Sequence, residues 1–382
     1  MWKVSVVVPI YNAEEYLVRC LDSIANQTLS DIEVICVNDG SSDSSLEIIN
    51  SYVNNDPRFK LLDKKNSGYG DTMNRGFDMA QGEYLSIVEA DDFIEPNMLE
   101  HLYSCAKEND LDVCKAGFFY YYSQPQNRDI ECKLPRAFAK KGTFCPSRDI
   151  RGLKNQIKFF GIKPTIWSAI YKREFLRSSG IEFTKTPGAS FQDTAFNFKV
   201  WALAKRVRLV DGCFLHYRQD NASSSVNSTS KVFCICDEMR EIDRFLDSHG
   251  ELSYLKPVMG AVKYDTYIWN YERLCCDPAR EFLLVAAKEL KKEIETGYLT
   301  KKALPPHKWS KLSFIVDDPE GYHTVRQEEK KNEVIVLEGE GGGSPIKRAI
   351  KSLKTNGLGY TLKKLFPKAR GKKSKKKETS KK

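Results

Sequence analysis

Three carboxylates lie close together in the segment YLSIVEADDFIEP, residues 84–96: Glu89, Asp91 and Asp92. The segment begins as an apolar run suited to a buried strand, so the acids stand where the strand is expected to end. Like charges that are partly withdrawn from water are costly unless a cation, a donor or a proton compensates them. The cluster therefore predicts either a ligand site at a strand end or a solvated loop in which Asp92 or Glu95 begins a helix.

Short strands rich in β-branched residues alternate with amphipathic helices around this cluster. The predicted strands are 4–9, 32–38, 58–62 and 84–90, and the predicted helices are 13–27, 43–55 and 68–81. This alternation predicts parallel βαβ units with right-handed crossovers. Because ligands bind at the carboxyl ends of such strands, the polar clusters at 9–12, 38–42 and 89–92 are expected along one crevice, which favours the ligand site over the solvated loop.

The rest of the chain divides by composition. A helix is predicted at 95–109 and a strand at 112–119, then a polar, proline-containing insertion at 120–150, apolar segments at 153–215 and mainly helices at 231–300. The predicted organisation is a catalytic domain over 1–225, with a donor-binding half at 1–120 and an acceptor half at 150–225, a mainly helical region at 226–338, a glycine-rich linker at 339–345 and a basic tail at 346–382.

The composition indicates a globular protein of the cytosol. The chain has 382 residues, of which 41% are hydrophobic and 29% charged. No apolar run reaches the roughly 18 to 20 residues that a membrane-crossing helix needs, and the N-terminus has the pattern of a strand, not of a signal peptide. The eleven cysteines are scattered without the spacing of zinc ligands, so we expect them to be reduced.

The positive net charge of +9 comes from the C-terminal tail. From Gly341 to Lys382 the chain holds fifteen Lys and Arg against one acid, which gives +14 and leaves −5 for the remainder. Apolar residues recur at helical spacing in this tail, a pattern typical of interfacial helices on an anionic membrane surface. The alternatives are a solubilising tail and a helix that packs on the body. Nucleic acid is a weaker candidate partner, because no nucleic-acid-binding motif accompanies the charge.

Four segments, taken in order and at their spacings, resemble the family 2 glycosyltransferases, which have a GT-A fold: VSVVVPIYNAEEYLVRCLDSI, VICVNDGSSDSS, NSGYGDTMNRGFDMAQGEY and IVEADDF. The resemblance is strong over about residues 3–120 and thinner over 160–220. It implies a Rossmann-like mixed sheet flanked by helices and an enzyme that moves a sugar from a nucleotide sugar to an acceptor. No G-x-G-x-x-G follows the first strand, which disfavours a dinucleotide-dependent oxidoreductase.

The first two segments provide candidate contacts to the nucleotide. The ring of Tyr11 can lie against a nucleobase, and Asn12 or Glu14 can begin the following helix. Asp39 projects from a strand end and can accept a hydrogen bond from a uracil N–H, as the matching aspartate of the family does, while Gly40 lets the backbone approach closely.

Turn chemistry at Asp39 and Ser41 is the structural alternative. The resemblance extends the predicted donor site to further positions: Pro9, Asn66, Gly68, Asn74, Ala90 and Trp167.

The acidic cluster matches the family's Asp-x-Asp motif, which grips the ribose and a divalent metal on the diphosphate. Glu89 and Asp91 occupy the matching positions, so Mn²⁺ or Mg²⁺ is the implied cofactor. Glu89 is a departure that lengthens the arm by one methylene. Asp92 either orients the donor sugar or caps the next helix. Met73 is a second departure, because many relatives have an arginine there.

Arg75 is no simple substitute for that arginine, since one position along a helix turns a side chain by about 100°. Lys64 and Arg218 are candidate phosphate contacts in its place.

The second half of the chain supplies a candidate catalytic base. Asp193 lies among aromatic residues and matches the second acid of the Glu-Asp pair that many relatives carry at a helix start, with Gln192 replacing the Glu. An apolar setting raises the pKa of a carboxylate and makes it a better base; the alternative is a helix cap. Trp167 is either near the sugar pocket or in the core. His216 is a candidate third metal ligand, although a lone histidine is more often structural.

These features together predict a metal-dependent, inverting transferase that uses a UDP-sugar. With a cytosolic location and a basic tail, the expected acceptor is a saccharide or a lipid-linked saccharide at the inner face of a bacterial plasma membrane, in the synthesis of a surface polysaccharide. The departures at Glu89, Met73 and Gln192 leave a rival, a non-catalytic nucleotide-sugar or glycan-binding protein of the same fold. A nucleic-acid-binding protein driven by the tail is the other rival.

Overall fold

The computed structural model describes residues 2–124, 126–139, 142–189, 191–221 and 231–338. The predicted linker and tail, residues 339–382, lie outside the described residues. The chain falls into two compact units, Met1–Tyr322 and His323–Lys382. The first unit contains the sheet together with most of the helices that follow it.

A mixed sheet of nine strands forms the centre of the first unit in the described part of the chain, in the order β3-β2-β1-β4-β8-β6-β9-β5, with β7 paired to β6. The first four strands run parallel: β1 (Val4–Ile10), β2 (Ile32–Asn38), β3 (Phe59–Asp63) and β4 (Tyr84–Ile87). Every residue of β1 and β2 is buried, as expected for the Val- and Ile-rich strands of a parallel sheet that is covered on both faces.

Antiparallel pairing begins beyond β4. The remaining strands are β5 (Phe93–Ile94), β6 (Val113–Tyr122), β7 (Arg128–Cys132), β8 (Ala169–Lys172) and β9 (Val207–Arg218). β8 is antiparallel to both β4 and β6, whereas β6 and β9 are parallel. The strand that follows β4 in the chain, β5, pairs with β9 at the far edge of the sheet, and β8 takes the place beside β4. The predicted fold class, a mixed α/β sheet with a helical C-terminal region, is confirmed.

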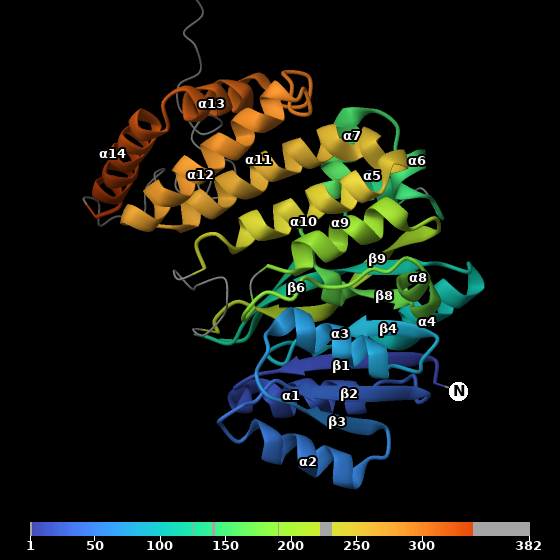
Figure 1. The fold of residues 1–382 in the computed structure, drawn as a ribbon. Helices are drawn as coiled ribbons and strands as arrows, with labels where there is room; N and C mark the ends of the chain where they lie inside the picture. Colours follow the sequence, from blue (N-terminus) through green and yellow to red (C-terminus); the bar gives the residue numbers. More distant parts are fainter. Residues whose placement is uncertain (1, 125, 140–141, 190, 222–230, 339–382) are drawn as a thin grey trace, which may run out of the picture. The chain divides into compact units, whose positions relative to one another are not determined.

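Three helices connect the four parallel strands (Figure 1): α1 (Glu14–Ala25), α2 (Ser45–Asn55) and α3 (Tyr69–Met79). A fourth, α4 (Met98–Glu108), leads from β5 to β6. The buried face of α1 consists of Leu17, Cys20, Leu21 and Ile24, the face that the helical spacing predicts. The predicted strand 84–90 is too long, because β4 ends at Ile87 and the acidic residues lie in the turn that follows.

The predicted irregular insertion at 120–150 holds regular structure. β6 continues to Tyr122, β7 pairs with it, and two short helices follow, α5 (Arg136–Ala139) and α6 (Pro146–Asp149). The strand β7 has four exposed residues in RDIEC, so its sequence shows no apolar alternation by which it could be recognised.

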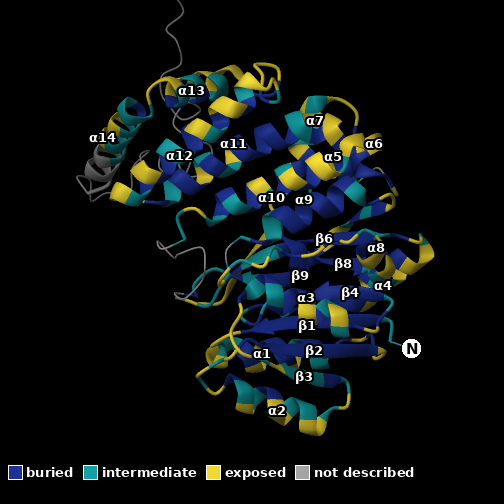
Figure 2. Cartoon of the chain, in the orientation of Figure 1, coloured by how far each residue is buried: buried dark blue, intermediate teal, exposed yellow. Residues whose placement is uncertain are grey.

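The remaining helices begin after α6. They are α7 (Leu153–Phe160), η1 (Ile166–Ser168), α8 (Arg173–Ser178), α9 (Asp193–Leu203), α10 (Cys234–Ser248), η3 (Gly250–Leu255), α11 (Lys256–Arg273), α12 (Cys276–Glu295), α13 (Pro306–Asp317) and α14 (Pro319–Glu338). In Figure 1, α10 lies between α9 and α11. Figure 2 shows that buried residues are continuous from the strands through α9, α10 and α11. The described residues contain no helix that is long and apolar enough to cross a membrane.

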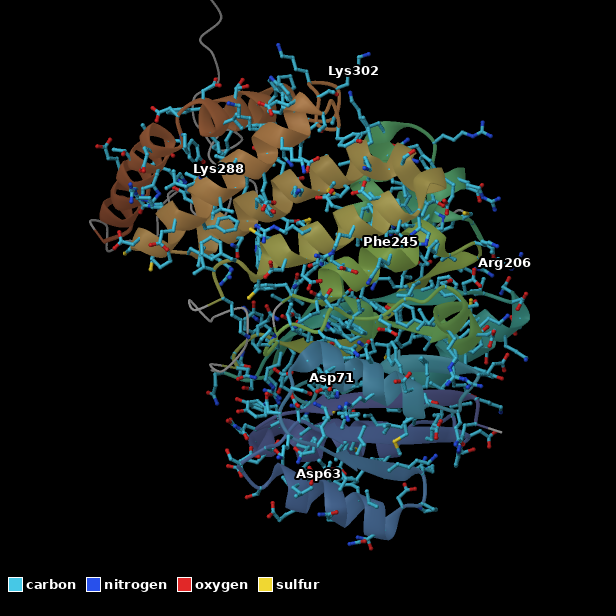
Figure 3. All side chains as sticks on the ribbon, in the orientation of Figure 1. Asp63, Asp71, Arg206, Phe245, Lys288 and Lys302 are labelled. Atoms are coloured by element: carbon cyan, nitrogen blue, oxygen red, sulfur yellow. The ribbon has the colours of Figure 1, made fainter. Side chains whose placement is uncertain are left out.

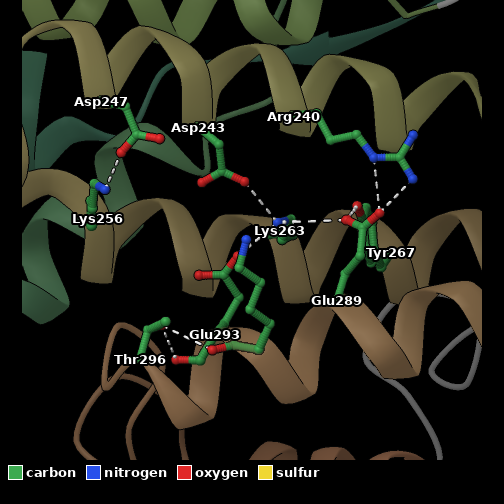
Figure 4. Close-up of polar contacts among 10 residues, drawn as sticks. Arg240, Asp243, Asp247, Lys256, Lys263, Tyr267, Glu289, Glu293 and Thr296 are labelled. Carbon is green, nitrogen blue, oxygen red and sulfur yellow. Dashed lines mark hydrogen bonds and ion pairs between the residues drawn. The ribbon is translucent and has the colours of Figure 1, made fainter.

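A buried charge network joins three of these helices. The Lys263 ammonium on α11 lies 2.7 Å from Glu293 and 3.0 Å from Asp243 (Figure 4). Glu289 is a further acidic neighbour, at 3.6 Å. A buried cation needs such compensation, and here the acids come from α10 and α12, so the network fixes how these helices pack around α11.

Candidate functional site

The loops after β1 and β2 are joined by side-chain hydrogen bonds at the carboxyl edge of the sheet. The side-chain amide oxygen of Asn12 accepts from the backbone N–H of Ser42 at 2.8 Å, and the Ser41 hydroxyl accepts from the backbone N–H of Asn12 at 3.0 Å. Glu14 begins α1, and its carboxylate accepts from the N–H of Ser44 at 2.8 Å. These predicted site residues are therefore brought together, and each is already engaged in shaping the loops.

Pro9 and Tyr11 lie on either side of the end of β1. Pro9 is buried within the strand opposite Val37. Tyr11 is 55% exposed, so its ring is accessible to a nucleobase at the place where the sequence predicts one. The position of Tyr11 is compatible with the predicted stacking contact, whereas Pro9 is a buried residue of the strand, which continues to Ile10.

Asp39 is the anchor of the loop that precedes α3. One carboxylate oxygen accepts from the N–H of Ser67 at 2.8 Å, and the other accepts from the N–H of Gly68 at 3.0 Å. The ammonium of Lys64 donates to the same carboxylate. The sequence suggested Lys64 as a phosphate contact. In the structure its charge instead compensates the Asp39 carboxylate. A uracil N–H would have to use the acceptor capacity that the second oxygen retains.

The glycines of this region allow close approach of the protein's own backbone. Gly40 has φ +70°, and a Cβ there would lie 2.8 Å from the backbone nitrogen of Asn66. Gly68 has φ +91°, and its Cβ would lie 2.7 Å from the carbonyl oxygen of Thr186. Asn66 itself is exposed in the loop. The close backbone approach predicted at Gly40 is thus made by another loop of the protein, at Asn66. Gly68 lets the start of α3 lie against the backbone of Thr186, in the second half of the sheet unit.

Asn74 does not face the nucleotide crevice with free polar groups. Its amide donates to the carbonyl oxygen of Phe183 at 3.0 Å and accepts from the N–H of Phe183 at 2.9 Å. Because both ends of the buried amide are engaged by backbone, we correct its predicted nucleotide contact to a link between α3 and the segment before α9.

Neither neighbour of Asn74 on α3 takes the place of the arginine that many relatives carry. Met73 is fully buried in the core, at the position where the arginine of many relatives stands. Arg75 is exposed and pairs with Asp71 at 2.8 Å on the surface of α3 (Figure 3 labels Asp71). Arg75 is therefore no replacement, as its direction on the helix predicted.

Asp91 and Asp193 lie close enough to Glu89 for their charges to act on its carboxyl. The Tyr69 hydroxyl donates to Glu89 at 2.7 Å, and the Asn221 amide donates to Asp91 at 2.8 Å. Withdrawal from water, with the nearby charges of Asp91 and Asp193, raises the pKa of Glu89 to about 8. Uncompensated carboxylates of this kind favour a bound cation.

Asp92 is held deeper than its neighbours, and Ala90 is buried beside it. One oxygen of Asp92 accepts from the N–H of Arg218 at 2.9 Å, whereas the other is buried without a hydrogen-bond partner among the described residues. Burial and the charge of Asp91 raise the pKa of Asp92 well above its usual value. The Arg218 guanidinium donates to the backbone oxygen of Asp91 at 3.0 Å, which places it beside the acidic turn.

The cluster fits a divalent cation that is shared with a substrate. Within the described ranges, no three His, Cys, Asp or Glu side chains gather closely enough to enclose an ion by themselves. Glu89 and Asp91 can supply two oxygen ligands, and Mg²⁺ typically takes one or two protein carboxylates and completes its shell with phosphate oxygens and water.

Asp193 is the first residue of α9 and is partly buried. Removal from solvent raises the pKa of its carboxyl to about 6, while the positive charge of Lys163 acts in the opposite direction. Gln192 precedes the first residue of α9 and makes no side-chain capping hydrogen bond, whereas the Asp193 carboxylate accepts from the backbone of Thr194 in the first turn, so a capping role is compatible with a catalytic one. The Gln192 amide donates to the hydroxyl of Thr186 at 2.8 Å and holds the loop before α9.

Trp167 is only 6% exposed and packs with Phe118 and Tyr217, at ring-centroid distances of 4.9 and 5.0 Å. It therefore belongs to the core that lines this side of the site. Lys163, which sequence reasoning missed, lies 4.6 Å above the Tyr217 ring. The segment around Lys163 has no motif that could have identified it, since its place depends on the packing of aromatic side chains.

His216 is not arranged as a metal ligand. Its two ring nitrogens lie 2.8 Å from Asp129 and 2.8 Å from Glu95, and its ring stacks between those of Phe93 and Phe119. With both nitrogens engaged away from Glu89, the residue joins β9 to its neighbours. We therefore correct the predicted third-ligand role to a structural one.

Glycosyltransferases are among the known proteins to which this chain is similar. The model of glycosyl transferase family 2 matches residues 5–177. The chain is 31% identical over 219 residues to EpsJ of Bacillus subtilis, an uncharacterized glycosyltransferase. This match covers 57% of this chain and 61% of EpsJ. It is 28% identical over 301 residues to EpsH of the same organism, a putative glycosyltransferase, covering 72% of this chain and 83% of EpsH. The chain thus spans less than two thirds of EpsJ.

The structure resembles that of S. aureus TarS residues 1–349, solved in complex with UDP-GlcNAc. The TM-score is 0.62 at 20% identity, and the match covers 86% of this chain and 92% of that one. At this identity the likeness establishes the fold.

Proposed function

We propose that the chain is a glycosyl transferase of family 2, whose model its residues 5–177 match, and that it transfers a sugar from a nucleotide sugar to a hydroxyl group of a saccharide or lipid-linked saccharide. The observation that carries the proposal is the position of Asp193, which is partly buried at the start of α9. Asp193 is also close enough to Glu89 that its charge raises the pKa of Glu89. A carboxylate with a pKa of about 6 is ionised at neutral pH and still basic enough to take a proton.

The proposed reaction is a single displacement with inversion. Asp193 accepts the proton of the acceptor hydroxyl while that oxygen attacks the anomeric carbon. The bond from this carbon to the diphosphate breaks, and the nucleoside diphosphate leaves with the electron pair. A divalent cation at Glu89 and Asp91 would neutralise charge on the departing diphosphate. Asn221 and Tyr69 hold these two carboxylates in place.

UDP is the proposed carrier. TarS, whose fold this chain shares, was solved with UDP-GlcNAc, and Tyr11 offers an exposed ring at the predicted base position. We place the reaction at the inner face of a bacterial plasma membrane, in surface-polysaccharide synthesis, because the basic tail 346–382 has the composition of an anionic-membrane anchor.

The test is an assay of the purified protein with Mn²⁺ and a panel of UDP-sugars, following UDP release and protection against thermal unfolding. Selective protection by one UDP-sugar, with slow release of UDP, supports the transferase. Protection by UDP alone, without sugar preference or release under any acceptor tried, would instead favour the non-catalytic binding protein.

A further inference from the structure

An exposed tryptophan lies on the helical region near the proposed base. Trp269 on α11 is 45% exposed, and it is the exposed member of the five tryptophans, all of which are described. A single exposed aromatic ring is ordinary on a protein surface, so exposure alone assigns no role to Trp269. Its role has to be argued from the residues around it.

The neighbour of Trp269 is Phe191, which comes two residues before Asp193. Their rings meet edge to face, with centroids 5.6 Å apart. Two residues of chain span at most about 7 Å, so the aromatic pair begins within a short distance of the base. Their contact joins the segment just before α9 to α11, the helices on either side of α10 in Figure 1.

Phe191 has a backbone conformation that bulky residues avoid. Its φ is +65°, and its carbonyl oxygen accepts from the N–H of Thr194 at 3.0 Å in the turn that starts α9. A positive φ at a phenylalanine persists only where the surroundings hold it, and such strain gathers at functional sites. From this turn the Phe191 ring, which is partly buried against the core, also meets the Trp269 ring.

Arg273 fixes the pair from one side. Its guanidinium lies 5.1 Å from the Phe191 ring and 5.6 Å from the Trp269 ring. It donates to the side-chain oxygen of Asn270 at 2.8 Å and to the backbone oxygen of Lys231 at 2.9 Å. The indole is thus held by a rigid, polar frame while its surface stays exposed, the arrangement typical of an aromatic anchor at a binding site.

We propose that Trp269 is a stacking platform for the sugar units of an oligosaccharide acceptor that lie beyond the unit reacting at Asp193. This inference rests on the proposed transferase function. The apolar C–H face of a pyranose ring complements an indole surface. Stacking of this kind reads the face of a ring more than its substituents, so it tolerates different sugars.

The test titrates the full chain with chitohexaose, cellohexaose and maltohexaose and follows tryptophan fluorescence, with calorimetry for variants that lack the indole. The proposal expects saturable binding of at least one hexasaccharide. Trp269→Ala should weaken it by about tenfold or more, which corresponds to about 1.4 kcal/mol, and Trp269→Phe should retain most of it. Tyr254→Ala is the matched control, because Tyr254 is 46% exposed on the same helical region.

The outcomes separate this inference from the function on which it rests. UDP-sugar protection against unfolding should be the same in Trp269→Ala and in the wild type, which also verifies that the variant is folded. If hexasaccharide binding depends on Trp269 but UDP-sugars give no protection against unfolding, the stacking role of Trp269 is supported and the proposed transferase function is refuted. The platform is refuted if no hexasaccharide binds, or if the binding is unchanged in Trp269→Ala.

Discussion

The carboxyl of Asp193 has a pKa of about 6 because its surroundings disfavour the charged form. An acid whose pKa is raised in the folded state destabilises the fold above that pKa, and the penalty vanishes below the unfolded pKa of 3.8. Asp193→Asn should therefore raise the free energy of unfolding at pH 7 to 8 by about 1 to 3 kcal/mol. Thermal unfolding from pH 3 to 8 measures this.

Below about pH 4 the variant and the wild type should unfold alike. A variant that is less stable than the wild type at pH 8 would contradict the buried, ionised carboxylate on which the proposed base depends.

Glu89 provides a second test at the same scale. Its pKa of about 8 means that the free protein holds a proton on this carboxyl at neutral pH, and a bound cation must displace it. The affinity for Mn²⁺ in the presence of UDP should therefore rise from pH 6 to about 8 and then level off. Calorimetric titration across this range measures it, and Glu89→Gln should weaken the affinity and flatten its pH dependence. An affinity that is independent of pH in the wild type would argue against Glu89 as a ligand.

At the residue scale, sequence reasoning located the carboxylates but not their partners. Glu89, Asp91 and Asp193 stand at predicted element ends, where local pattern is informative. Asn74 and His216 were misassigned because their partners lie far along the chain: Asn74 bonds Phe183, and His216 bonds Glu95. Only the folded chain shows that these polar groups are already satisfied.

At the scale of elements, α3 connects the two halves of the sheet unit through a tight contact. A Cβ on Gly70 would lie 2.0 Å from the carbonyl oxygen of Thr184, closer than any real contact. Gly70→Ala should therefore destabilise the protein by about 1 to 3 kcal/mol or more, because backbone cannot move aside easily. Urea unfolding measures it. Gly250→Ala, with no atom within 4 Å of the added Cβ, is the matched control. Equal midpoints for the two variants would contradict this docking of α3.

Strands and helices were predictable wherever burial imposes a period. The boundaries of β2 match the predicted 32–38, since Ile32–Asn38 is buried throughout. β7 was missed because most of its residues are exposed and its pairing partner β6 determines it. The change from parallel to antiparallel pairing after β4 could not be predicted from the sequence either, because β8, the strand that makes it, is only four residues long.

At the scale of the whole molecule, charge is divided between a body of −5 and a tail of +14 from Gly341 onward. Cutting the chain after Glu338 should abolish its binding to liposomes that contain anionic lipid, since each basic residue near such a surface contributes about 1 kcal/mol. Co-sedimentation at low and high salt measures the effect, with neutral liposomes as the control. If the shortened chain binds these liposomes as well as the full chain does, the tail is not the membrane-binding segment.

The measurement that tests the central claim most directly compares Asp193→Asn with the wild type in both UDP release from the preferred UDP-sugar and UDP-sugar affinity. Asp211→Asn, on an exposed residue, is the matched control. The account predicts that Asp193→Asn loses turnover by about 10² to 10⁴-fold, the range expected for a general base, with donor affinity within about twofold of the wild type. Turnover that survives in Asp193→Asn, or donor affinity lost together with turnover, would contradict Asp193 as the base of a glycosyl transfer.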